Sequence, residues 1–326
     1  MKNPPAPSAQ TGWFLPSLVV TTGLTRPAPQ KHPSRKEYAL IETESKRELT
    51  GFEERRLSSG NSQIRYFVGG EGPPVALVHG LGGLASNWRK IAPALAADRR
   101  VILPELPGHG GSAPLRDAPA LDPFADAVLG VLEAEDALPA PWVGHSFGGL
   151  VGLRAAVRRP EAVTGLVLAA AAGISSATRI GEATVTIIGV LRPGRVLGRH
   201  RRRVSRSPLG RTLAFGWWGV ADPAGLEPEM AEAFLAGPPQ HTDTLSAGRA
   251  LVGADPRSDL DRVGCPCLCL WGANDNWVPL QDGMEYARRL RAPLRSIADC
   301  GHLLVGERPE VVVRAVRDFL AGLDSG

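Results

Sequence analysis

The stretch Trp142-Val143-Gly144-His145-Ser146-Phe147-Gly148-Gly149 carries the most information in this chain. It contains the pattern Gly-x-Ser-x-Gly, follows an apolar segment and leads into small residues with helical character. A strand that turns sharply into a helix holds a serine at the apex of the turn, with its Oγ atom exposed above the sheet. The flanking glycines suit such a turn, because a Cβ there would collide with neighbouring backbone. The alternative is a glycine-rich loop with an incidental serine, and the rest of the sequence has to decide between the two.

The length and composition fit one large α/β domain with an insertion or a tail. The 326 residues are 43% hydrophobic and 21% charged, which is ordinary for a globular protein. No apolar run reaches the roughly 18 to 20 residues that span a bilayer. We expect no secretory signal, because Pro16 interrupts the short apolar run of residues 13–20 and no clear small-residue cleavage site follows it.

The net charge of +4 is unevenly distributed. Residues 1–36 hold five basic residues and no acid, and they are rich in Pro, Ser, Thr and Gln, so we predict a disordered basic tail there. Residues 183–221 contain eight arginines and no Asp or Glu. Two local patches do not indicate a nucleic-acid partner. Within the second patch, the run Arg192 to Arg206 is either a solvated basic face or, less commonly, a surface that steers anionic substrates or docks on an acidic surface, including anionic membrane lipid.

The four cysteines do not form a disulfide framework. Cys265, Cys267 and Cys269 alternate along one predicted strand, so they face one side and do not pair readily with one another. Such positions also converge poorly on a tetrahedral ion, and we expect no metal site. Together with Cys300 they are interpreted as buried thiols in a reducing compartment, which predicts a cytoplasmic protein.

Short apolar strands alternate with helices along most of the chain. This alternation predicts a mostly parallel central sheet flanked by helices. The predicted strands are residues 54–57, 63–68, 74–78, 100–103, 141–143, 163–171, 266–271 and 294–297. The predicted helices are residues 88–97, 121–137, 147–159, 280–290 and 309–323.

The alternation stops between residues 174 and 257. Amphipathic segments separated by Gly and Pro take its place, and no buried strand is evident among them. We therefore predict a helical insertion over residues 174–257, between the two parts of an α/β core, residues 37–173 and 258–326. Within the insertion, the predicted amphipathic segments are residues 178–191, 209–220, 228–235 and 242–252.

Ser146 needs a general base, and His302 is the best candidate among seven histidines. His32 lies in the predicted tail, His200 and His241 lie in the insertion, and three others lie beside glycines in tight turns. His302 follows the last predicted strand, so it can reach across the carboxyl ends of the parallel strands. The alternative is a loop histidine bonded to backbone.

Asp275 is the candidate for the acid that orients this base. It follows the predicted strand of residues 266–271, which precedes the strand and loop that lead to His302. Asp275 also completes the chain order Ser…Asp…His. A surface-loop aspartate is the alternative. Asp299 is closer in sequence to His302, but we expect it to point away from that residue. After the 163–171 strand, no carboxylate occurs until Glu182.

Two backbone N–H groups are candidates for an oxyanion hole. Phe147 N–H lies at the start of a helix, where the helix dipole favours negative charge. Leu81 N–H lies in the glycine-rich stretch His79-Gly80-Leu81-Gly82-Gly83. We expect Asn87 and Trp88 to support this loop.

Four motifs in this order resemble the α/β-hydrolase superfamily over roughly residues 50–326. The matching residues are His79-Gly80, Gly144-His145-Ser146-Phe147-Gly148-Gly149, Gly272 to Asp275 with Val278-Pro279, and Gly301-His302 followed by Glu307 and Pro309. The resemblance implies an α/β-hydrolase fold with a helical lid inserted after the sixth strand, and no cofactor. One departure is Glu105, before Leu106-Pro107-Gly108-His109-Gly110, where similar proteins usually carry Asp. That turn is structural, so the change casts little doubt on catalysis.

The resemblance further implies a serine hydrolase that cleaves a carboxylic ester or related acyl bond of a small molecule through an acyl-enzyme on Ser146. Thioester or lactone hydrolysis, carbon–carbon bond hydrolysis of diketones, acyl transfer, cofactor-free perhydrolysis and a non-catalytic binding protein remain alternatives. Haloalkane dehalogenases and epoxide hydrolases fit less well, because they carry aspartate at the position of Ser146.

Aromatic residues in the predicted lid are candidates for binding substrate. Trp217 and Trp218, with Phe215, either wall an acyl or aromatic pocket or pack the lid onto the core. Trp277, two residues after Asp275, is a further substrate-binding candidate. The sequence leaves the natural substrate and the oligomeric state open.

Overall fold

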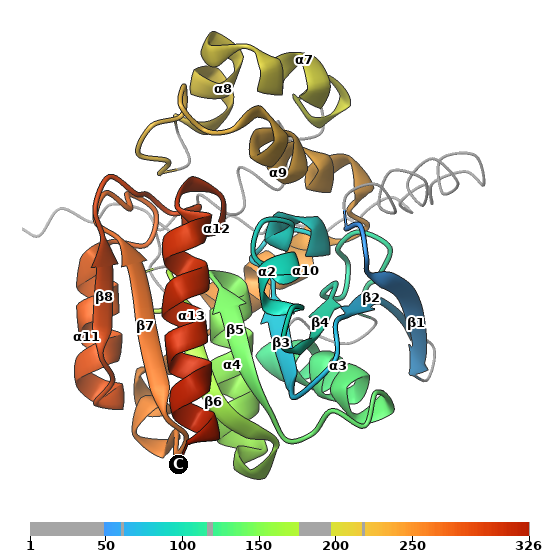
Figure 1. Ribbon diagram of the computed structural model, residues 1–326, viewed down its shortest axis with the longest axis vertical. Coiled ribbons are helices and arrows are strands. Elements are labelled where there is room, and N and C mark those ends of the chain that lie inside the picture. Colours follow the sequence, from blue (N-terminus) through green and yellow to red (C-terminus); the bar gives the residue numbers. More distant parts are fainter. Residues whose placement is uncertain (1–48, 60–61, 116–119, 176–196, 217–218, 326) are drawn as a thin grey trace, which may run out of the picture. The chain divides into compact units, whose positions relative to one another are not determined.

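The computed structural model describes residues 49–59, 62–115, 120–175, 197–216 and 219–325, which belong to one compact unit (Figure 1). Within these residues, eight strands form one sheet in the order β1-β2-β4-β3-β5-β6-β7-β8. The pairs β1–β2 and β2–β4 are antiparallel, and the other five pairs are parallel. The strands are β1 (Glu53–Ser59), β2 (Ser62–Gly69), β3 (Pro74–Val78), β4 (Arg100–Pro104), β5 (Ala140–His145), β6 (Val163–Ala169), β7 (Cys267–Gly272) and β8 (Leu294–Ile297).

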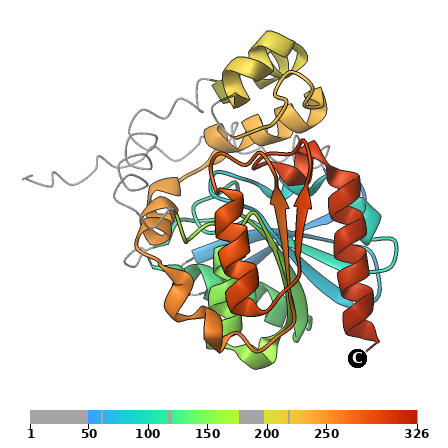
Figure 2. The same ribbon diagram turned by 90° about the vertical axis from the view of Figure 1, so that its left-hand side faces the viewer.

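Helices cover both faces of this sheet, as Figure 2 shows for α11 (Leu280–Leu290) and α13 (Pro309–Asp324), which lie on opposite sides. The central strands β3, β5, β6 and β7 are almost wholly buried, as expected for parallel strands with both faces covered. The prediction of a mostly parallel sheet flanked by helices is therefore confirmed. The remaining core helices are α2 (Ala92–Leu95), α3 (Leu121–Ala134), α4 (Phe147–Arg158) and α12 (Leu304–Glu307), with 3₁₀ turns η1 (Ala85–Trp88), η2 (Pro160–Ala162), η3 (Pro256–Ser258) and η4 (Leu260–Arg262).

Two predicted helices differ from the structure. The helix expected over residues 88–97 is replaced by η1 and the four-residue α2. Pro93 lies in the first turn of α2, and because it has no N–H to donate to an earlier carbonyl, it separates the two turns. The helix expected to reach residue 137 ends at Ala134, because Asp136 adopts a left-handed conformation with φ of 48°.

Among the described residues between β6 and β7, four α-helices occur: α7 (Arg201–Arg206), α8 (Pro208–Phe215), α9 (Pro228–Gln240) and α10 (Thr244–Val252). No strand occurs among the described residues of 197–257. Phe215, Met230 and Leu235 belong to a small apolar cluster within this insertion. The predicted segment 178–191 lies outside the described residues, as does the predicted tail. The division into tail, core and lid, with its boundaries, therefore stays a prediction.

The four cysteines are buried or partly buried, as expected for core residues. Cys267 and Cys269 are buried, Cys265 is partly buried, and all four cysteines are free thiols. Within the described ranges, no helix is long and apolar enough to cross a membrane. The predicted cytoplasmic location stays a prediction.

Candidate active site

Ser146 sits alone between β5 and α4 in a strained turn, with φ of 52° and ψ of −116°. Its N–H donates to Ala169 O on β6 over 2.9 Å, which fixes the turn against the neighbouring strand. A Cβ at Gly144 would lie 2.5 Å from the backbone of Gly149, and one at Gly148 would lie 2.3 Å from a backbone oxygen of β3. The glycines of the motif are thus required by the close approach of backbone that raises Ser146 above the sheet.

A line of hydrogen bonds connects Ser146, His302 and Asp275. His302 Nε2 lies 3.0 Å from Ser146 Oγ, and His302 Nδ1 lies 2.8 Å from Asp275 Oδ2. The other carboxylate oxygen, Oδ1, accepts from Trp277 N–H over 2.8 Å and from Val278 N–H over 2.9 Å. A carboxylate accepts hydrogen bonds, so Nδ1 carries the imidazole proton and the Nε2 lone pair faces the serine hydroxyl. The structure thus brings together the three side chains selected from the sequence. Asp299 is exposed and lies outside this line.

The loop that carries His302 is held by the insertion. His302 N–H donates to Gly219 O over 2.6 Å. A Cβ at Gly301 would lie 1.6 Å from that same oxygen, so the backbones meet only because Gly301 has no side chain.

Glu307, in α12, also binds the loop that carries His302. Its carboxylate accepts from the N–H groups of Ala221, Gly301 and Leu303 over 2.8 to 3.1 Å. Burial raises the pKa of Glu307, against the opposing effect of these three hydrogen bonds. Sequence reasoning included Glu307 in the motif without assigning it this contact.

His145 contacts both the backbone and the ring of His302. Its Nε2 lies 2.9 Å from His302 O, and the two ring centroids are 5.1 Å apart. Burial, with a smaller contribution from His302, lowers the pKa of His145 to about 3. The ring is therefore neutral near pH 7, and its Nε2–H donates to the carbonyl. In the sequence, His145 stands out only as a histidine beside a glycine, and no pattern indicates this contact.

The loop after β3 brings a second set of backbone donors to Ser146. A Cβ at Gly80 would lie 3.0 Å from Ser146 Cβ, so this loop lies directly against the serine. Within the part of the chain that the structure describes, neither Leu81 N–H nor Phe147 N–H donates a hydrogen bond to another protein group. Asn87 supports the loop as expected, because its Oδ1 accepts from Leu84 N–H over 2.9 Å.

The aromatic candidates for substrate binding lie in different surroundings. Trp277 is half-buried, and its ring centroid lies 6.4 Å from that of His302. Phe215 packs against Phe234 inside the insertion and is 4% exposed, so its role is packing. Trp217 and Trp218 lie outside the described residues.

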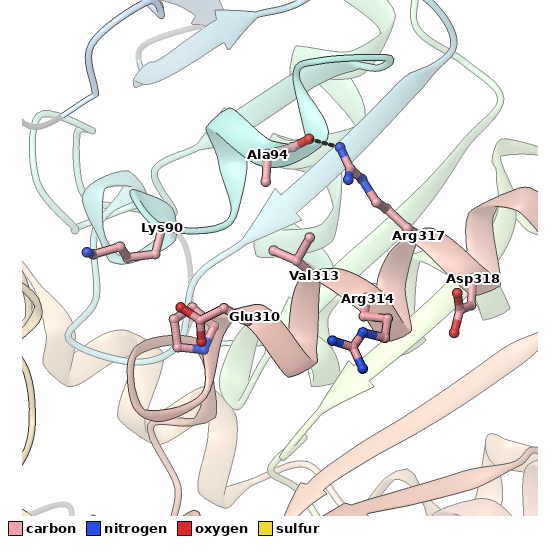
Figure 3. Close-up of a pocket in the computed structure, with 8 residues that line it drawn as sticks. Lys90, Ala94, Glu310, Val313, Arg314, Arg317 and Asp318 are labelled. Carbon is pink, nitrogen blue, oxygen red and sulfur yellow. Dashed lines mark hydrogen bonds between the residues drawn. The ribbon is translucent and has the colours of Figure 1, made fainter.

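A surface hollow of about 380 Å³ lies between α2 and α13, and its lining residues do not include Ser146, His302 or Asp275 (Figure 3). Three of its charged side chains have partners: Lys90 pairs with Glu227 over 2.7 Å, Arg317 donates to Ala94 O, and Asp318 pairs with Arg295 over 3.0 Å. Among the described residues, no cluster of His, Cys, Asp or Glu is suited to hold a metal ion. The line through Ser146 is therefore the candidate active site.

Comparison with known proteins identifies the family of the chain. The sequence model of the Alpha/beta hydrolase family matches residues 75–315, and the chain belongs to that family. It is 35% identical over 270 residues to the dihydrolipoyllysine-residue acetyltransferase component of the acetoin cleaving system of Pseudomonas putida, a match that covers 80% of this chain and 67% of the relative.

Two hydrolases show similar identity over a larger share of their own length. The 2-hydroxymuconate semialdehyde hydrolase of Pseudomonas sp. (strain CF600) is 32% identical, over 78% of this chain and 89% of the relative. The pimeloyl-[acyl-carrier protein] methyl ester esterase of Chromobacterium violaceum is also 32% identical, over 77% of this chain and 95% of the relative.

Proposed function

We propose that the protein is a serine hydrolase that cleaves a carboxylic ester, or a related acyl bond, through an acyl-enzyme on Ser146. The observation that carries this proposal is the hydrogen-bonded line from Asp275 through His302 to Ser146, at 2.8 and 3.0 Å. An acid, a base and a nucleophile in this arrangement are the requirements for acyl transfer through a serine.

In the acylation step, Ser146 Oγ attacks the carbonyl carbon of the substrate while its proton passes to His302 Nε2. The imidazolium that forms is stabilised by the buried carboxylate of Asp275, to which its Nδ1–H donates. The negative charge on the carbonyl oxygen is stabilised by Leu81 N–H and Phe147 N–H. When the tetrahedral intermediate collapses, the alcohol leaves and takes the proton from His302.

Deacylation uses the same groups with water as the nucleophile. His302 Nε2 accepts a proton from the water, whose oxygen attacks the acyl carbon. The bond to Ser146 Oγ then breaks, and the serine recovers its proton from His302. The products are a carboxylic acid and an alcohol, and the enzyme returns to its starting state.

The relatives support an acyl bond and also favour a second candidate. The similarity to a methyl ester esterase supports ester hydrolysis. The similarity to a 2-hydroxymuconate semialdehyde hydrolase favours cleavage of a carbon–carbon bond next to a ketone as the second candidate.

The test is hydrolysis of p-nitrophenyl esters from acetate to palmitate by wild type and Ser146→Ala, with fluorophosphonate labelling in parallel. We expect turnover in the wild type and a loss of roughly 10⁴- to 10⁶-fold in the variant. Labelling of Ser146 without ester turnover, combined with cleavage of a vinylogous diketone, would establish the second candidate. A Ser146→Ala variant with wild-type turnover, or a wild type with neither labelling nor turnover, would overturn the proposal.

A further inference from the structure

Three buried histidines form a row beside the loop that carries Leu81. His79 directly follows β3, His109 lies in the turn after β4, and His241 follows α9 of the insertion. The ring centroids of His79 and His109 are 5.1 Å apart, and those of His109 and His241 are 5.0 Å apart. The three side chains are at most 7% exposed.

Each of the three rings has a backbone N–H at one nitrogen and a backbone carbonyl at the other. The N–H contacts are Leu106 N to His79 Nε2 (3.0 Å), Gly82 N to His109 Nε2 (3.0 Å) and Gly110 N to His241 Nδ1 (3.2 Å). The carbonyl contacts are His79 Nδ1 to Gly80 O (2.8 Å), His109 Nδ1 to Pro107 O (3.0 Å) and His241 Nε2 to Gly82 O (2.8 Å). An amide N–H only donates, so the nitrogen it faces is unprotonated and the opposite one donates to the carbonyl. All three rings are therefore neutral.

These contacts fall on three consecutive peptide groups around Leu81. The peptide that contains Leu81 N–H also contains Gly80 O, which accepts from His79. The next peptide contains Gly82 N–H, which donates to His109, and the one after it contains Gly82 O, which accepts from His241. Because a peptide group is planar, a bond to one end fixes the direction of the other.

The insertion is in close contact with this loop. A Cβ at Gly237, in the last turn of α9, would lie 2.5 Å from Gly82 O. Thr242 N–H and Asp243 N–H each donate to Gly108 O over 3.0 Å, so the segment after α9 also binds the turn that carries His109.

We propose that His241 is a positioning residue through which the insertion aims Leu81 N–H at the oxyanion. This inference rests on the proposed function, in which Leu81 N–H stabilises the oxyanion. His241 touches no reacting atom. It acts by holding Gly82 O, while His109 and His79 hold the two preceding peptide groups. Oxyanion donors contribute to catalysis only when they are aimed in advance at the place where the charge develops, so loosening one end of the loop lowers kcat.

The test compares His241→Leu with His241→Gln. Leucine removes both hydrogen bonds, whereas the glutamine amide has an acceptor and a donor at a spacing close to that of the two imidazole nitrogens. We expect His241→Leu to lower kcat by about 10- to 100-fold with little change in KM, and His241→Gln to recover most of the loss. His200→Leu is the matched control, because His200 is an exposed histidine of the same insertion, and it should match wild type.

A trifluoromethyl ketone separates positioning from simple loss of structure. Ser146 Oγ adds to its carbonyl carbon, the serine proton passes to His302, and the adduct carries an oxyanion. We expect the affinity of His241→Leu for this inhibitor to fall by the same factor as kcat/KM. Wild-type kcat in His241→Leu, or equal losses in the leucine and glutamine variants, would overturn the inference.

If His241→Leu does not fold, His109→Leu and His109→Gln make the same test from the other side of Gly82. The wild type distinguishes this inference from the proposed function. A wild type that neither hydrolyses esters nor labels with fluorophosphonate would refute the function itself. An active wild type with an unaffected His241→Leu would refute only the positioning role.

Discussion

His302 and the row formed by His79, His109 and His241 use the same side chain in opposite ways. The two nitrogens of His302 face side-chain oxygens, a hydroxyl on one side and a carboxylate on the other. The nitrogens of the other three rings face backbone N–H and carbonyl groups. A hydroxyl can give up its proton and a carboxylate can stabilise the resulting imidazolium, whereas a backbone amide does neither at ordinary pH.

The partners of a histidine, more than its burial, therefore decide whether it transfers a proton or holds a loop. All four side chains are buried. Protonating a ring of the row would set an N–H against a backbone N–H, whereas protonating His302 Nε2 leaves its bond to Asp275 intact and strengthened. One group is built to change its protonation state, and the other is built to keep it.

The largest effect is expected from replacing His302 by glutamine. A glutamine amide can donate to Asp275 and accept from Ser146, but it cannot take up the serine proton. We therefore expect His302→Gln to lower kcat by roughly 10⁴- to 10⁶-fold. The same change at His241 should retain most activity, because there the ring only makes hydrogen bonds. Steady-state kinetics with one p-nitrophenyl ester measure both variants, and comparable losses in the two would break the distinction.

The next largest effect is expected from Asp275→Asn. Asp275 Oδ1 accepts from Trp277 N–H and Val278 N–H, so the asparagine oxygen stays there and its NH₂ group turns toward His302 Nδ1. His302 must then carry its proton on Nε2, which can no longer accept the serine proton. We expect kcat to fall by about 10⁴-fold with the fold preserved. Activity within tenfold of wild type would show that the tautomer of His302 does not depend on this carboxylate.

Much of the fold follows from local sequence patterns. The strand at Pro74–Val78 and the helix at Leu280–Leu290 have the predicted bounds, because a continuous apolar run and an amphipathic repeat each specify one element. The helix predicted over residues 88–97 was wrong. The turn η1 packs against α9 and α12, and the short α2 packs against α13, and sequence periodicity does not report those distant contacts.

The three side chains of the candidate site were predictable because each follows a strand end. The roles of His145, His241 and Glu307 could not be predicted from the sequence. His241, for example, bonds Gly82 and Gly110, which are 159 and 131 residues away, through backbone atoms. Any residue offers the same backbone atoms, so such a bond leaves no pattern in the sequence.

The smallest effect is expected in the pH dependence of the unfolding free energy, to which the buried neutral histidines contribute. Burial holds the pKa of His79 and of His109 below the ordinary 6.5, and that of His145 near 3. In the unfolded chain these rings take up protons as the pH falls below about 6.5, while in the folded protein they take them up only at lower pH. The unfolded state then binds more protons than the folded state. The stabilisation that these rings contribute is therefore fully present above about pH 6.5 and is lost as the pH falls toward their pKa values in the folded protein.

One proton of difference changes the unfolding free energy by about 1.4 kcal/mol per pH unit, so three such rings contribute at most about 4 kcal/mol per pH unit near pH 5.5. Asp282 and Glu307 oppose this trend, because burial raises their pKa values and the folded state then binds protons more readily than the unfolded state. We therefore expect a net slope of about 2 to 4 kcal/mol per pH unit in urea unfolding between pH 6 and 5. His145→Gln should reduce the slope by about 1.4 kcal/mol per pH unit, the contribution of one proton, while the exposed control His200→Gln leaves it unchanged. A flat profile would mean that the buried rings accept protons in the folded state, and the backbone contacts would then not fix their charge.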